Sequence, residues 1–194
     1  MKIILTLFVL LFSSSVFADD ISDFQIEGMS IGDSLLDYMS KEEIKSEIKS
    51  NRYMYDYLNE DFGEVYLYDE LHTYSYMSFF VKPDDKKFLI YRFRGLIDYI
   101  EDSKGCHKKQ NEIVEEISEI FNDAKKSEQS IKSRHDPSGK STVDKVIFTF
   151  NSGDQIQIQC TNYEENLRMK NNWSEGISVI ISTKEAIDWL TISN

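Results

Sequence analysis

Residues Glu64–Tyr99 read EVYLYDELHTYSYMSFFVKPDDKKFLIYRFRGLIDY and carry the clearest structural signal in the chain. Aromatic and β-branched residues alternate with polar ones in three runs, 64–68, 74–81 and 88–99, as in strands with one buried face. The segment around Pro83 supplies a turn between the second and third runs. Short hairpin connections favour antiparallel pairing, so this stretch predicts a three-stranded antiparallel sheet.

Helical patterns flank this stretch on both sides. Before it, Ser40-Lys41-Glu42-Glu43 matches a capping box, which predicts the start of a helix. After it, isoleucines recur at helical spacing between Cys106 and Phe121 with glutamates largely opposite, which predicts an amphipathic helix. A second capping box, Ser182-Thr183-Lys184-Glu185, predicts a short terminal helix. Three further strands are expected at 143–150, 155–160 and 176–182.

These elements predict the fold class. The polar stretch Asn122–Thr142 has no apolar periodicity, so we expect an exposed loop there. The rest predicts a single α+β domain over residues 19–194, with an antiparallel β-sheet of about six strands and helices packed on one face. A helix followed by three strands occurs twice, so two α-β-β-β halves also fit, although no matching residues establish an internal repeat.

The first residues have the organisation of a signal peptide. Lys2 precedes the apolar run Ile3–Phe12, and Val16-Phe17-Ala18 is a small-residue cleavage pattern. The run is about ten residues long, half of what a membrane-spanning helix needs. We therefore expect residues 1–18 to be removed, and the protein to be periplasmic or secreted with no membrane span.

The net charge of the chain argues against some classes of partner. The chain has 34 Asp and Glu against 22 Lys and Arg, a formal net charge of −12. An acidic surface repels nucleic-acid phosphates and anionic lipids, which argues against partners of both kinds. An unknown protein or small ligand is the expected partner, with no cofactor.

The tripeptide Gly139-Lys140-Ser141 matches the end of a phosphate-binding loop. Such a loop is followed by a helix, whereas a strand is expected after this tripeptide.

Two cysteines, Cys106 and Cys160, are present. In a chain made for an oxidising compartment, a disulfide between them is the default expectation. The alternative is a reactive thiol at Cys106, because a helix N-terminus beside it would favour the thiolate.

A candidate ligand or partner face follows from the period of two in the predicted strands. Tyrosine combines an apolar ring with a hydroxyl, which suits a face that contacts a partner or a sugar-like ligand, and arginines add polar anchors. The alternative is ordinary packing of these rings in a half-buried sheet. The residues of this face are Tyr66, Tyr68, Tyr74, Tyr76, Arg92 and Arg94.

Catalysis is the alternative function. No nucleophile, base and orienting group stand at recognisable spacing, and no His or Cys pair has metal-ligand spacing, so neither a catalytic nor a metal site is expected. A small secreted hydrolase would have to use His107, or His135 with Asp136, for acid–base work.

The stretch Ile31-Gly32-Asp33-Ser34-Leu35-Leu36-Asp37-Tyr38-Met39 resembles the start of small exported bacterial proteins. The β-lactamase-inhibitor-like proteins and the small outer-membrane assembly lipoproteins begin in a similar way. The resemblance covers one short segment and implies a binding module without catalysis, built on an antiparallel sheet covered by helices. The chain differs from these families in lacking a lipidated cysteine and the Gly-x-Pro after the helix. Two further segments, Asp136–Ser141 and Gly153–Cys160, look like blocks of exported bacterial proteins of unknown function.

Overall fold

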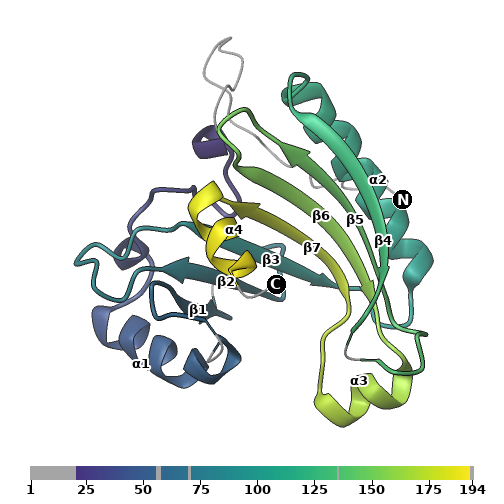
Figure 1. Cartoon of the computed structure of the whole chain (residues 1–194), viewed down its shortest axis with the longest axis horizontal. Helices are drawn as coiled ribbons and strands as arrows, with labels where there is room; N and C mark the ends of the chain where they lie inside the picture. The colour runs from purple at the N-terminus through teal and green to yellow at the C-terminus, as the bar shows by residue number, and fades with distance from the viewer. Residues whose placement is uncertain (1–20, 56–57, 70, 135, 193–194) are drawn as a thin grey trace, which may run out of the picture.

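The structure is a computed structural model that describes residues 21–55, 58–69, 71–134 and 136–192. The predicted signal peptide and His135 lie outside these residues. The part described forms one seven-stranded antiparallel sheet with four α-helices (Figure 1), which confirms the predicted α+β class. In chain order the elements are η1 Ile21–Asp23, η2 Leu35–Asp37, α1 Lys41–Asn51, η3 Arg52–Tyr55, β1 Gly63–Leu67, β2 Tyr76–Val81, β3 Arg92–Asp98, α2 Ser103–Ile120, β4 Lys125–Lys132, β5 Thr142–Thr149, β6 Gln155–Asn162, α3 Glu165–Asn171, β7 Gly176–Ser182 and α4 Lys184–Thr191.

The strand order is β1-β2-β3-β7-β6-β5-β4, and every neighbouring pair is antiparallel. A helix with three consecutive strands occurs twice, first α1 with β1 to β3 and then α2 with β4 to β6. Strand β7 comes last in sequence and pairs with β3 on one side and β6 on the other. The two meanders therefore become one sheet only through β7.

One strand lies inside the predicted loop Asn122–Thr142, so the expectation of an exposed, irregular loop there is wrong. Strand β4 pairs with β5 along its whole length, from Lys125 opposite Thr149 to Lys132 opposite Thr142. Every residue of β4 is exposed. A strand without a buried face has no alternation of apolar residues, which explains why its sequence resembles a loop.

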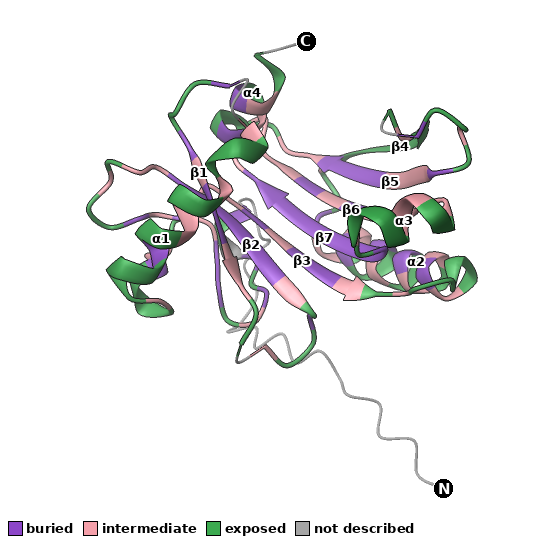
Figure 2. Ribbon diagram, turned by 90° about the horizontal axis from the view of Figure 1, so that it is seen from below, coloured by how far each residue is buried: buried purple, intermediate pink, exposed green. Residues whose placement is uncertain are grey.

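Helices pack on both faces of the sheet, not on one (Figure 2). On α2 the residues Cys106, Gln110, Val114 and Ile117 are buried against one face. Gln110 Nε2 donates hydrogen bonds of 2.9 Å to backbone oxygens of β5 and β6. On the other face, Trp189 of α4 packs against Phe80 of β2, with ring centroids 5.4 Å apart. No helix in the described ranges has the length and apolar character needed to cross a membrane.

The predicted disulfide between Cys106 and Cys160 is present. It ties the first turn of α2 to β6, with the two Cα atoms 5.9 Å apart. The alternative of a free, reactive thiol at Cys106 is therefore wrong.

Removing the disulfide by the double substitution Cys106→Ala and Cys160→Ala should destabilise the fold. The bond joins residues 54 positions apart. Closing a loop of this length restricts the unfolded chain, so loss of the bond should lower the unfolding free energy by up to about 4 kcal/mol. Guanidinium chloride unfolding of the oxidised protein and the double variant measures the difference. A loss well below about 1 kcal/mol would mean that the bond adds little beyond the packing of α2.

Candidate functional site

One face of the sheet carries most of the predicted aromatic and basic residues, and we call it the tyrosine face. Side chains alternate between the two faces along a strand. The register therefore places Tyr66 of β1, Tyr76 of β2, and Arg92 and Arg94 of β3 together on the face opposite α2. Helix α4 covers one end of this face, where Trp189 lies.

Three of the predicted tyrosines form a compact group on this face. The ring centroids of Tyr66, Tyr68 and Tyr76 are 5.8 to 6.0 Å apart, and the rings of Tyr66 and Tyr68 are stacked. Tyr68 is 63% exposed, whereas Tyr66 and Tyr76 are half-buried. Burial raises the pKa of the Tyr66 and Tyr68 hydroxyls, so both stay protonated, and the Tyr66 hydroxyl donates a hydrogen bond to Met54 Sδ at 3.8 Å.

Tyr74 does not belong to this group, which corrects its predicted place on the face. It precedes β2, so the period of two that fixes Tyr76 does not extend to it. Its ring lies over Gly95 on the opposite face, where a Cβ added to Gly95 would come within 2.5 Å of the ring. Tyr74 is 7% exposed and is part of the core on that side.

The two arginines of β3 lie beside this group. Arg94 Nε donates a 2.9 Å hydrogen bond to Ser178 Oγ of β7, and its guanidinium carbon is 5.8 Å from the Tyr76 ring centroid. The guanidinium of Arg92 lies 4.6 Å from the ring centroid of Phe80. Both distances are within the range of a cation–π interaction. Burial lowers the pKa of Arg92, although an arginine stays protonated in a protein.

Glu64 adds a buried carboxylate to the same face. It is 5% exposed, and its Oε2 atom has no hydrogen-bond partner within the described residues. By register, Phe80 lies between Glu64 on β1 and Arg92 on β3. Its spacing of two from Tyr66 could have revealed Glu64 in the sequence. Ser178 could not be found, because nothing local indicates that β7 pairs with β3.

Arg168 of α3 lies between two glutamates, although its Nε has no hydrogen-bond partner within the described residues. Arg168 Nη2 is 2.9 Å from Glu101 Oε1, and its Nε is 3.8 Å from Glu175 Oε2. Glu175, which is 3% exposed, also accepts hydrogen bonds from the backbone N–H groups of Glu101 and Tyr163. This cluster fixes α3 and the chain before α2 to the end of β6, and all its carboxylates are in use.

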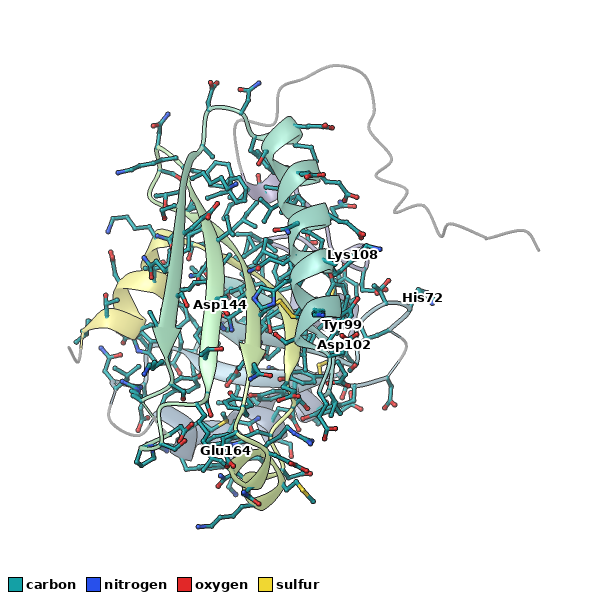
Figure 3. All side chains as sticks on the ribbon, turned by 90° about the vertical axis from the view of Figure 1, so that its right-hand side faces the viewer. His72, Tyr99, Asp102, Lys108, Asp144 and Glu164 are labelled. Carbon is teal, nitrogen blue, oxygen red and sulfur yellow. A yellow bond between two sulfur atoms is a disulfide. The ribbon has the colours of Figure 1, made fainter. Side chains whose placement is uncertain are left out.

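His107 lies beside both a serine and a carboxylate, as the hydrolase alternative requires. Its Nδ1 is 2.7 Å from the backbone oxygen and 3.3 Å from the hydroxyl oxygen of Ser103, and its Nε2 is 3.2 Å from Oδ2 of Asp144 on β5, which Figure 3 labels. The serine lies one helical turn before His107, and its backbone oxygen is closer to Nδ1 than its hydroxyl is. A general base needs a nitrogen that faces the hydroxyl it deprotonates. The geometry therefore fits a contact between α2 and β5 better than a nucleophile–base pair.

Asp136 organises its own loop. Its carboxylate accepts hydrogen bonds from the N–H groups of Ser138, Lys140 and Ser141 and from the Ser141 hydroxyl, at 2.7 to 3.1 Å. Hydrogen bonds from Ser138 and Ser141 hold the pKa of the Asp136 carboxyl well below its usual range. A carboxylate in this state cannot deliver a proton near neutral pH, which argues against the acid–base role considered for Asp136.

A metal site and a cavity are the remaining candidates. In the described ranges, no three His, Cys, Asp or Glu side chains gather closely enough to hold a metal ion. A cavity of about 450 Å³ lies between α1 and residues 58–64. Lys45, Lys49 and Arg52 contribute basic groups to its lining, and Arg52 is paired with Glu60.

Comparisons of the chain with models of protein families, with curated proteins and with solved structures found no match. The site therefore has to be judged on its own geometry.

Replacing Asp136 by Asn should destabilise the protein in a pH-dependent way. The folded-state pKa lies below the ordinary value of about 3.9, so the carboxylate contributes its full stability above about pH 4 and loses it as the pH falls toward the folded-state pKa. The difference in unfolding free energy between the protein and Asp136→Asn should be constant from pH 7 to pH 5 and shrink below pH 4. Thermal unfolding at a series of pH values tests this. The exposed Asp84→Asn is the control, and an equal loss in that variant would contradict the local role of Asp136.

Proposed function

We propose that this protein is an exported binding module without catalytic activity, and that the tyrosine face contacts its ligand or partner. The observation that carries this proposal is the group of Tyr66, Tyr68 and Tyr76 beside Arg92 and Arg94, on the face opposite α2. Rigid amphipathic rings next to arginines are the side chains most enriched at binding surfaces.

The exposure of these residues supports binding over simple packing. A ring that only fills the core would be buried like Phe79 or Phe93, which are 0% exposed. Tyr68 is mostly exposed, yet its ring is held between two others and loses little conformational freedom on contact with a ligand. Its hydroxyl remains available at the rim.

The chemistry of the other candidate residues favours binding over hydrolysis. The Nδ1 of His107 is closer to the Ser103 backbone oxygen than to the Ser103 hydroxyl, and the carboxylate of Asp136 is occupied by backbone donors. Export agrees with the disulfide, since such bonds persist in oxidising compartments. The predicted signal peptide gives the same location, periplasmic or secreted.

A comparison of tyrosine variants tests this function. The oxidised protein lacking residues 1–18 would be immobilised and exposed to a native envelope extract, beside the double variant Tyr68→Ser and Tyr76→Ser. We expect the protein to retain a component, small molecule or protein, that the double variant retains at least about tenfold less, because truncating a central aromatic residue of an interface typically costs 2 kcal/mol or more. Mass spectrometry identifies and quantifies what is retained.

The matched control is Tyr38→Ser. Tyr38 is 38% exposed beside η2 and makes none of the ring contacts of the three-tyrosine group. This variant should retain the component as the unchanged protein does. Retention of nothing by the native protein, or equal retention by the double variant, would contradict the proposed function.

A further inference from the structure

The chain has five arginines, of which Arg134 is exposed. Arg52 and Arg168 form ion pairs with glutamates. Arg92 and Arg94 are half-buried on the tyrosine face, and within the described ranges neither forms an ion pair. A partly desolvated guanidinium without a counter-charge is unfavourable, and the chain has 34 carboxylates that could have supplied one.

Within the described residues, most of the hydrogen-bonding capacity of the two guanidiniums is also unused. Each guanidinium has five N–H donors in a fixed plane. Arg94 uses its Nε–H for Ser178, and this bond sets the direction of the remaining donors. Arg92 is positioned by the ring of Phe80, and no acceptor for it is found in the part of the chain that the structure describes. The side chains are thus oriented by their neighbours before any ligand arrives.

The nearest carboxylate on this face does not neutralise them. Glu64 lies two strands away from Arg92, with Phe80 between them, and forms no ion pair with it. Its charge favours the protonated form of Arg92 without occupying the donors. Arg92 and Arg94 are alternate residues of one strand, so their Cα atoms are roughly 7 Å apart and both can reach one ligand.

We propose that Arg92 and Arg94 form an oxyanion-binding site, and that the ligand of the tyrosine face carries a carboxylate or phosphate group. This inference rests on the proposed function of that face. The planar donor fork of a guanidinium matches both groups, and two such forks neutralise the charge of the ligand. The rings of Tyr76 and Tyr66 provide a surface beside the site for the body of the ligand.

Nuclear magnetic resonance of the arginine Nε–Hε groups tests this site directly. The ¹⁵N-labelled, oxidised protein would be titrated with sodium phosphate and, separately, with sodium acetate, at an ionic strength held constant with sodium chloride. We expect saturable shifts of the Arg92 and Arg94 signals in the millimolar range, with Arg52, Arg134 and Arg168 unchanged. A response to one titrant only would identify the oxyanion as phosphate or carboxylate.

Charge-conserving variants provide the second measurement. Arg94→Lys keeps the charge but loses the fork and the Nε–H bond to Ser178, so its apparent affinity should fall by about tenfold or more. Arg52→Lys, which alters an ion-paired arginine elsewhere, should leave the titration unchanged. Thermal unfolding of each variant without titrant confirms that it is folded.

Two outcomes would overturn the oxyanion site. One is a linear shift, equal for all five arginines, which indicates screening alone. The other is an unchanged affinity in Arg94→Lys. If either occurs while Tyr68→Ser with Tyr76→Ser still abolishes retention from the envelope extract, the face binds a ligand of other chemistry and the proposed function stands.

Discussion

The pairing of β7 with β3 and β6 is the interaction on which the rest of the structure depends. All seven residues of β7 are buried, and each edge of the strand is hydrogen-bonded to a different meander. Strand β7 is the last strand in the sequence, so its partners β3 and β6 are both synthesised before it. Without β7, the tyrosine group and the disulfide-linked helix would belong to two separate small sheets. Ser178 of the same strand also holds Arg94, so the central pairing reaches the candidate site.

The two faces of the sheet are covered unequally. Helix α2 is attached to the sheet by apolar packing, by Gln110 and by the disulfide. The opposite face has α4 packed at one end, over Phe80 and Phe62. Its remaining strand positions carry the tyrosines and arginines, half-buried. A face left in this state is suited to contact with something outside the chain.

Local sequence patterns predicted the strands and helices that bury one face, and the helices that begin with a capping residue. Ser40 and Glu43 form the capping box that their spacing indicates, and the alternation around Phe79 marks β2 correctly. The polar strand β4 and the seven-residue helix α3 have no comparable signal, because β4 is stabilised by its pairing with β5 and α3 by the ion pairs of Arg168. Long-range pairing decides such elements, and it leaves no local trace in a single sequence.

The residues of the candidate site also differ in whether the sequence predicts their position. Tyr66, Tyr68, Tyr76, Arg92 and Arg94 were predictable because each lies within or directly after a strand with a clear period of two. The place of Tyr74 depended on where β2 begins, and on the absence of a side chain at Gly95. That Arg92 and Arg94 form no ion pair with a described residue could be seen only once the strands were placed, since ion pairs form between residues far apart in sequence.

The most direct test of this account is a crystal structure of the oxidised protein without residues 1–18. We expect the Tyr66, Tyr68 and Tyr76 rings to lie together at the surface, with the guanidiniums of Arg92 and Arg94 in contact with solvent or a bound anion and not with a carboxylate of the chain. A carboxylate of the same molecule bonded to Arg94, or a segment of the chain packed over the three rings, would contradict it.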